Sequence, residues 1–234
     1  MDAVAVVIPA RDEQDRVLDC LDAVLVARRA AGRLCPRITI TLVADDCRDA
    51  TVRRAASRPD VRVLEIDAAC VGTARRVGMA SAIAELDGAG EVWLASTDAD
   101  TIVPPNWLEV QLDAAARGFD AVIGTVRPDF TELPPDLVRG WIATHGGGQA
   151  IGHVHGANLG IRAGAYLGAG GFLDQCEHED NDLVDRLRMG GARMLATDAA
   201  EVVTSGRRFG RTSGGFAGYL REQLPRLAPD ILEA

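Results

Sequence analysis

The chain has 234 residues, of which 47% are hydrophobic, and it carries a formal net charge of −9. A chain of this length and composition can bury a large core, which excludes wholesale disorder. The negative balance argues against a nucleic-acid partner and against tight docking to an anionic membrane surface.

The first half of the chain alternates short apolar runs with longer segments of helical spacing. Val4 to Ile8 predicts a buried strand, and apolar residues such as Leu21 and Val24 then recur at helical spacing. This alternation, the typical sign of an α/β fold, predicts a mainly parallel central sheet with helices on both faces. The predicted strands are 4–8, 38–43, 61–66, 92–95 and 121–126, and the predicted helices are 13–29, 49–57, 73–86 and 106–117.

After Arg127 the alternation gives way to a segment rich in Pro, Gly and His. No shift in composition marks a linker, so we predict a single domain over residues 1–234. Its parallel half covers 1–127, and a more irregular half with flexible loops covers 128–234. In this second half the predicted helices are 135–143, 180–189 and 214–227, and the predicted strands are 158–161 and a short one around 202–203.

Five cysteines are scattered along the chain without any Cys-x-x-Cys pair. This pattern predicts neither a disulfide framework nor a zinc site, and it favours the cytoplasm. The N-terminus has an acid at Asp2 and no basic segment, which predicts no secretory signal. No apolar run approaches the roughly 18 residues of a transmembrane helix. The cysteines are Cys20, Cys35, Cys47, Cys70 and Cys176.

Acidic residues follow three of the predicted strands, where each strand leads into its loop. In open α/β sheets the carboxyl ends of the strands form the ligand site. Carboxylates crowded there repel one another unless something compensates, and a hard divalent ion is the simplest compensation. Taken singly, each acid could instead be a helix cap or a first-turn residue. The acids are Asp12, Glu13, Asp45, Asp46, Asp49, Asp98 and Asp100.

Six segments in chain order resemble the motifs of family 2 glycosyltransferases, which have the GT-A fold. They lie between residues 4 and 205 and read VAVVIPARDEQDRVLDCLDAVL, VADDCRDAT, VGTARRVGMASA, TDAD, GANLGIRAGAYLGAGGF and EHEDNDLVDRLRMGG. Cys47 and Arg48 depart from the usual pair in the second motif. Six motifs in the family's order are a far stronger signal than any one of them.

The resemblance implies an inverting transfer of a sugar from a nucleotide-diphosphate sugar to an acceptor hydroxyl. TDAD resembles the family's metal-binding motif, so Asp98 and Asp100 are expected to hold Mg²⁺ or Mn²⁺. Asp180 matches the family's general base, and Glu179 is expected to support it. Residues 1–127 are then the nucleotide-sugar-binding half and residues 128–234 the acceptor-side half.

The nucleotide sugar is expected to contact the first two strand ends and the helix after the third strand. A basic loop of Arg, Gly and Ser at 205–215 can also pair with diphosphate. His153 and His155 share one face of an extended segment, but without a third histidine nearby in the sequence they do not predict a metal site. The expected nucleotide-sugar-binding residues are Pro9, Ala10, Arg11, Glu13, Asp45, Asp46, Arg75, Asp98, Arg207 and Arg208.

Two alternatives remain open from the sequence. A sugar nucleotidyltransferase shares a similar half-sheet, but the loop after Ile8 lacks the glycine that such an enzyme is expected to carry. A non-catalytic nucleotide-sugar-binding protein derived from a transferase is the second alternative. The sequence does not define the donor base, the sugar or the oligomeric state, and the acceptor could be a small metabolite or a lipid-linked molecule.

Overall fold

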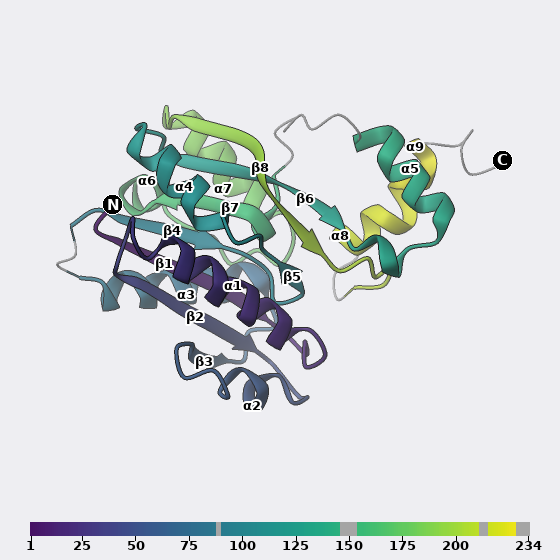
Figure 1. Cartoon of the computed structure of the whole chain (residues 1–234), viewed down its shortest axis with the longest axis horizontal. Helices are drawn as coiled ribbons and strands as arrows, with labels where there is room; N and C mark the ends of the chain where they lie inside the picture. Colours follow the sequence, from purple (N-terminus) through teal and green to yellow (C-terminus); the bar gives the residue numbers. More distant parts are fainter. Residues whose placement is uncertain (88–89, 146–153, 211–214, 228–234) are drawn as a thin grey trace.

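The computed structural model describes residues 1–87, 90–145, 154–210 and 215–227, and an eight-stranded sheet forms its centre (Figure 1). The order of the strands across the sheet is β3-β2-β1-β4-β7-β6-β8-β5. The strands are β1 (Ala3–Ala10), β2 (Ile38–Asp45), β3 (Arg62–Ile66), β4 (Val92–Ser96), β5 (Thr101–Ile102), β6 (Ala121–Pro128), β7 (Leu159–Arg162) and β8 (Met194–Thr204).

The sheet is mainly parallel, as the alternation of strands and helices predicts. β1 pairs in parallel with β2 and β4, β2 with β3, and β6 with β8. β7 lies antiparallel between β4 and β6, and β5 is antiparallel to β8. The helical crossovers between the early strands explain the parallel pairings, because a parallel neighbour needs such a connection. Strands from both predicted halves therefore build one sheet.

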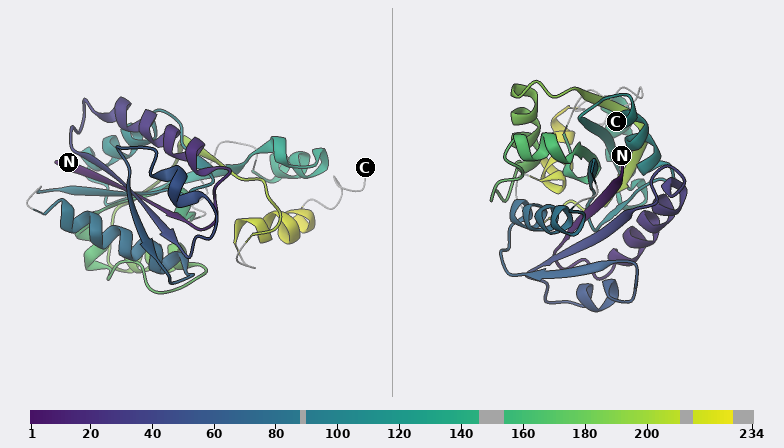
Figure 2. Two further views of the ribbon diagram at one scale, coloured as in Figure 1. Left: turned by 90° about the horizontal axis from the view of Figure 1, so that it is seen from below. Right: turned by 90° about the vertical axis from the view of Figure 1, so that its left-hand side faces the viewer.

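Helices cover both faces of the sheet (Figure 2). One face packs against α1, α2 and α4, and the other against α3, α6 and α7. None of the described helices combines the length and the apolar character needed to cross a bilayer. The bounds of these helices are α1 (Val17–Ala31), α2 (Thr51–Ala55), α3 (Val71–Glu85), α4 (Trp107–Ala116), α6 (Ala163–Gly168) and α7 (Glu179–Met189).

β1 shows why the central strands have nearly continuous apolar sequences. All eight of its residues are buried. Val4, Val6 and Ile8 face the α1 side, whereas Ala5 and Val7 face the α3 side. Because alternate side chains of a strand point to opposite faces, a strand covered by helices on both sides needs an apolar residue at every position.

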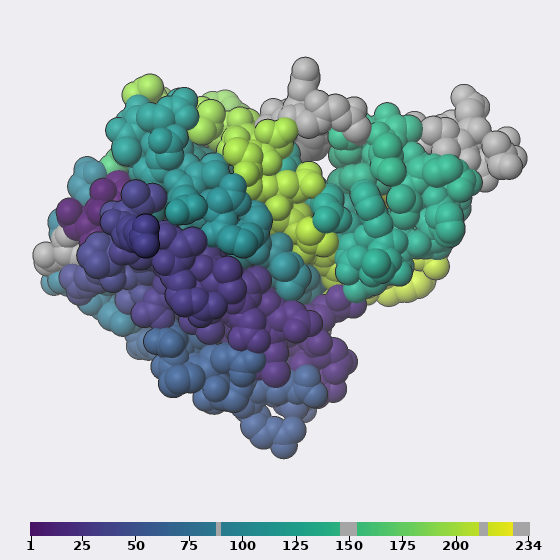
Figure 3. All heavy atoms as spheres, viewed as in Figure 1, coloured from purple at the N-terminus to yellow at the C-terminus, as the bar shows by residue number. Residues whose placement is uncertain are grey.

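A small helical lobe extends from one end of the sheet (Figure 3). It contains α5 (Pro135–His145), α8 (Phe216–Gly218), the π-helical turn Tyr219–Gln223 and α9 (Leu224–Leu227). These segments share an apolar core of their own, which lies apart from the two cores of the sheet. The core consists of Leu133, Leu137, Trp141, Leu220 and Leu224.

The observed bounds differ from the predicted ones at two places that affect the site. The first helix begins at Val17 rather than at 13, because a turn that includes Asp12 with a φ of 49° precedes it. β8 extends over Met194–Thr204, although the sequence predicts a strand only around 202–203. Most residues in the first part of β8 are exposed or half-buried, so its sequence lacks the apolar alternation of a core strand.

Candidate active site

A cavity of about 1280 Å³ opens at the carboxyl ends of β1, β2 and β4, and the lobe contributes to its wall. Most of the predicted site residues line this cavity, although they come from distant parts of the chain. Asp46 and Arg208 do not belong to the lining. The predicted residues in the lining are Pro9, Ala10, Arg11, Glu13, Asp45, Arg75, Asp98, Asp100, Glu179, Asp180 and Arg207.

Arg75, near the start of α3, connects the predicted metal motif to the predicted base segment. Its guanidinium donates to the carboxylates of Asp98 and Glu179, and its Nε donates to Ser96 Oγ at 3.2 Å. Only 3% of its side chain is exposed. Burial by itself lowers the pKa of Arg75, but the charges of Asp98 and Glu179 outweigh it, and the pKa is raised above its usual value.

The charged groups of Arg75, Asp98 and Glu179 depend on one another. Burial raises the pKa of Glu179 above its usual value, although Arg75 acts in the opposite direction. Burial likewise raises the pKa of Asp98, again against Arg75. Gly156 leaves the space that the guanidinium occupies, since a Cβ at this position would lie 2.4 Å from the guanidinium carbon. The cluster therefore consists of one arginine, two carboxylates and a glycine that leaves room for the guanidinium.

Arg207 forms a second acid–arginine cluster directly after β8. It donates two hydrogen bonds to Glu13, at 3.0 and 2.7 Å, and its guanidinium lies 2.9 Å from Asp100 Oδ2. Thr204 Oγ1 donates to Asp100 Oδ1 at 3.3 Å. Burial raises the pKa of Asp100 to about 6, against the effect of Arg207. Thus Arg207 pairs with one of the two aspartates that the sequence predicts as metal ligands.

Asp180 lies in the first turn of α7, beside Glu179, and lines the cavity. Its Oδ2 accepts a hydrogen bond from the Gly156 backbone N–H at 2.7 Å, and its Oδ1 accepts one from the Asn181 N–H at 2.8 Å. These two bonds hold the carboxylate in one orientation. The preceding residue, His178, has a φ of 61°, which turns the chain sharply into the helix.

The two aspartates at the end of β2 have different environments. Asp45 is buried, and its carboxylate accepts from the backbone N–H groups of Ala68, Ala69 and Cys70 at 2.7–2.8 Å. It therefore holds the loop that leads into α3, while part of it still lines the cavity. Asp46 pairs with Arg11 at 2.7 Å and orients that arginine, which does line the cavity.

A disulfide joins Cys70 to Cys176, so the expectation that the cysteines would not pair was wrong for these two. The residues are 106 positions apart, and their Cα atoms lie 4.6 Å apart. Nothing in their sequence spacing indicates the pair. It arises because the start of α3 packs against the loop before α7, where Gly72 N–H also donates to the Gln175 carbonyl at 3.1 Å.

The lining also has an aromatic part that the sequence motifs do not predict. Trp141 and His145 on α5, together with Phe216 and Tyr219 on the C-terminal segment, line the cavity from the lobe. His155 also lines it, whereas His153 lies outside the described residues. The sequence predicts a helix at 135–143, which corresponds to α5. Which face of this helix meets the C-terminal helices depends on the tertiary fold.

Comparison with known proteins agrees with this fold. Residues 5–163 match the family described as Glycosyl transferase family 2. The undecaprenyl-phosphate 4-deoxy-4-formamido-L-arabinose transferase of Edwardsiella ictaluri is 34% identical over 150 residues. The matched region makes up 59% of this chain and 43% of that transferase, so the chain spans less than half of this relative.

Solved structures share the fold at low sequence identity. Residues 1–349 of S. aureus TarS superpose with a TM-score of 0.61 and 11% identity, covering 99% of this chain and 66% of that one. A mannosyltransferase of Pyrobaculum calidifontis, in complex with GDP-Man and Mn²⁺, has a TM-score of 0.61 and 18% identity, covering 98% and 73%. Because the family match spans most of the chain, the protein is a member of glycosyltransferase family 2 with the GT-A fold.

Proposed function

We propose that the protein transfers a sugar from a nucleotide-diphosphate sugar to an acceptor hydroxyl with inversion at the anomeric carbon, and that Asp180 is the general base. One observation carries the proposal. Buried Arg75 joins Asp98, just beyond the carboxyl end of β4, to Glu179, the neighbour of Asp180 on α7, at the wall of a single cavity. Structural relatives in complex with UDP and with GDP-Man support a nucleotide-bearing donor.

The position of Asp180 in the cavity lining supports its proposed role as the base. The acceptor oxygen would form a bond to the anomeric carbon while its proton passes to an Asp180 oxygen. The bond from the anomeric carbon to the diphosphate oxygen would break, and its electron pair would leave with the nucleotide diphosphate. Attack opposite the leaving group inverts the anomeric centre. The hydrogen bonds from Gly156 and Asn181 would keep the carboxylate aimed at the acceptor.

The charges around the cavity fit a divalent ion. Arg75 and Arg207 face an excess of carboxylates, and a nucleotide diphosphate would add further negative charge. Asp98 and Asp100 would hold Mg²⁺ or Mn²⁺ through their oxygen atoms, and the bound ion would stabilise charge on the departing diphosphate. In the described part of the chain no three metal-binding side chains cluster, so donor oxygens would complete the ligand set. The carboxylates concerned are Glu13, Asp98, Asp100, Glu179 and Asp180.

No observation favours the nucleotidyltransferase or the non-catalytic protein over a transferase. The acids at Asp98, Asp100 and Asp180 are all in place along one cavity. We keep the cytoplasm as the expected location.

Calorimetric titration with UDP, GDP and TDP, with and without Mn²⁺, tests the donor side. We expect at least one nucleotide to bind more tightly with the ion, and Asp100→Ala to remove this difference. Asp113→Ala, an exposed aspartate on α4, is the matched control. If no nucleotide binds wild-type protein in a metal-linked way, the metal-dependent mechanism is wrong.

Release of nucleotide from a nucleotide sugar, with water replacing the acceptor, tests the base. Asp180→Asn should keep nucleotide affinity and lower this rate by roughly 10²–10⁴-fold, which is the usual contribution of a general base. Asp185→Asn changes an exposed aspartate of the same helix and should leave the rate unchanged. An unchanged rate in Asp180→Asn would show that another group takes the proton.

A further inference from the structure

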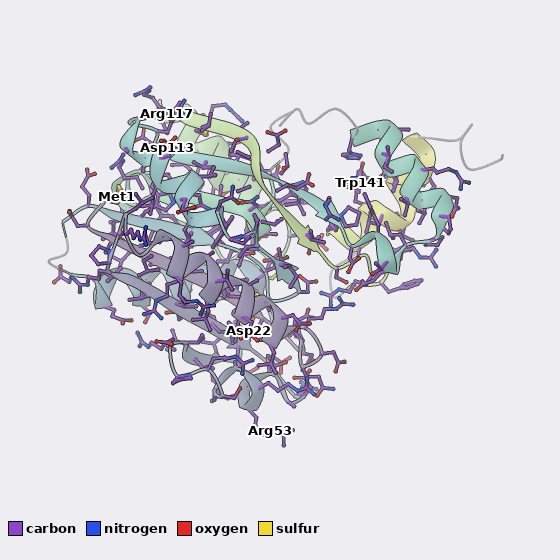
Figure 4. All side chains as sticks on the ribbon, viewed as in Figure 1. Met1, Asp22, Arg53, Asp113, Arg117 and Trp141 are labelled. Atoms are coloured by element: carbon purple, nitrogen blue, oxygen red, sulfur yellow. A yellow bond between two sulfur atoms is a disulfide. The ribbon has the colours of Figure 1, made fainter. Side chains whose placement is uncertain are left out.

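Four rings of the lobe and the ring of His155 meet at one side of the cavity. Trp141 stacks on His145 with ring centroids 3.8 Å apart and an interplanar angle of 3°. Phe216 and Tyr219 meet Trp141 edge-on, with centroids 5.8 and 6.1 Å away, and the His155 ring lies 5.9 Å from Phe216. We call this set the aromatic wall, and all five residues line the cavity. Figure 4 labels Trp141, which lies in the lobe, across the molecule from Met1.

The aromatic wall connects directly to the proposed base. His155 precedes Gly156, whose backbone N–H donates to Asp180 Oδ2 at 2.7 Å. The same short segment therefore presents a ring to Phe216 on one side and orients the base carboxylate on the other. An acceptor with its hydroxyl at Asp180 would have the aromatic wall beside it.

The charges in the part of the cavity beside Asp180 and the aromatic wall disfavour an anion. Each arginine in the described lining is already paired with carboxylates: Arg11 with Asp46, Arg75 with Asp98 and Glu179, and Arg207 with Glu13 and Asp100. The sequence contains no lysine. Besides Glu179, the lining acids from residues 128–234 are Glu177, Asp180, Asp198 and Glu201, of which Glu201 pairs with Arg127.

We propose that the acceptor carries an apolar or aromatic ring and no negative charge, and that this ring packs on the aromatic wall. The proposal deepens the transferase function given above and rests on it. Rings stack well on aromatic side chains, and a neutral or cationic group suits the surrounding acids. A phosphate-bearing acceptor would instead face carboxylates at close range without an unpaired arginine among the described lining residues, which is unfavourable.

Three small phenols of similar shape test whether the site prefers a neutral or cationic acceptor over an anionic one. Tyramine, tyrosol and 4-hydroxyphenylacetate share a 4-hydroxyphenyl ring and a short side chain, but at neutral pH the chain is cationic, uncharged and anionic, respectively. We expect calorimetry to show binding of tyramine and tyrosol, with 4-hydroxyphenylacetate roughly tenfold weaker or more. Equal or tighter binding of the anion, or no binding of any of the three, overturns the proposal.

Variants of two phenylalanines test the aromatic wall itself. Phe216→Leu should weaken tyrosol roughly two- to tenfold, the usual effect of one aromatic pair. Phe209→Leu is the matched control, because Phe209 is 76% exposed and does not line the cavity. An unchanged affinity in Phe216→Leu, or an equal loss in both variants, shows that the probes do not use the aromatic wall.

The donor and acceptor results can be told apart. The probes are titrated into free protein and into protein with UDP and Mn²⁺, and UDP is also titrated alone into each variant. Phe216→Leu should keep the UDP affinity of wild type. Failure of nucleotide binding by wild type overturns the proposed function, whereas the order of the three probes on free protein decides the acceptor proposal separately.

Discussion

Arg207 donates two hydrogen bonds to the carboxylate of Glu13, although the two residues are 194 positions apart in the chain. Glu13 is almost fully buried, so the pair ties the loop after β8 to the loop after β1. The same guanidinium lies 2.9 Å from Asp100. A residue expected to bind diphosphate is thus paired with the acids of the site. When a donor binds, we expect Arg207 to exchange at least one carboxylate for a phosphate oxygen.

The first prediction concerns this pair. Arg207→Met should lower the free energy of unfolding by about 1–3 kcal/mol, because it removes the two hydrogen bonds that the buried carboxylate of Glu13 accepts from Arg207. The loss is smaller than for a fully buried pair, since 32% of the Arg207 side chain is exposed. Urea denaturation measures it. Glu13→Gln in the same background should recover part of the loss.

The adjacent arginine provides the control for that experiment. Arg208 is exposed and lies outside the cavity lining, so Arg208→Met should change the free energy of unfolding by less than about 0.5 kcal/mol. Equal destabilisation by the two arginine variants would mean that the loss of a positive charge from the loop matters, and the specific pairing with Glu13 does not.

The second prediction concerns the glycine beside Arg75. Gly156→Ala would place a Cβ 2.4 Å from the guanidinium, which is held by Asp98 and Glu179 and has little freedom to move. We expect a loss of about 1–3 kcal/mol in the free energy of unfolding, typical of overpacking. Gly164→Ala is the control, because its Cβ position meets no other part of the protein within 4 Å beyond its own helical turn. Thermal denaturation of the two variants should separate them clearly, and similar melting temperatures would contradict the tight fit.

The third prediction uses the pKa of Glu179, which burial raises above the usual value of 4.5. A carboxyl group with a raised folded-state pKa contributes stability that is fully present below the unfolded-state pKa. This stability is lost as the pH rises through the folded-state pKa. Glu179→Gln removes this dependence. The unfolding free energy of Glu179→Gln minus that of wild type should therefore increase as the pH rises above about 4.5.

Urea denaturation over a series of pH values measures this difference. Glu85→Gln, at the exposed end of α3, is a suitable control and should show no comparable trend. A difference for Glu179→Gln that stays constant, or that decreases with rising pH, would mean that pairing with Arg75 dominates over burial at this carboxyl.

The fourth prediction concerns the cysteines. Denatured protein prepared without reductant should expose three thiols to a thiol-specific reagent, because Cys70 and Cys176 form a disulfide and the other three of the five cysteines are free. Cys70→Ser should expose four, since Cys176 then loses its partner. Five thiols in the unreduced wild type would exclude the disulfide.

The native protein should react mainly at one cysteine. Cys47 is half-buried, whereas Cys20 and Cys35 are buried, and burial raises the pKa of the Cys20 thiol. Because the thiolate is the reactive form, Cys20 should stay unmodified until the protein unfolds. Mass spectrometry of protein alkylated under native conditions identifies the modified residue, and rapid labelling of Cys20 would contradict its burial.

Much of the sheet and its acidic edge could be predicted from the sequence. β1 and β4 are apolar at every position or nearly so, and acids follow at the point where each strand ends. Both signals can be found in a short stretch of sequence. Burial on two faces selects apolar residues along a strand, and the residues that follow parallel strands meet at one edge of the sheet. The family motifs then extend this prediction to Glu179 and Asp180, whose segment lies at the same cavity.

Tertiary structure decided which of those residues interact. The sequence placed Arg75, Asp98 and Glu179 in the site, but nothing local to any of them indicates that one guanidinium serves both carboxylates. The disulfide, the contact of Arg207 with Glu13 and the aromatic wall were not visible for the same reason. Each depends on surfaces that meet only when distant segments pack together, and on the burial that packing creates. Local periodicity records that a residue is buried, whereas its partner depends on the whole fold.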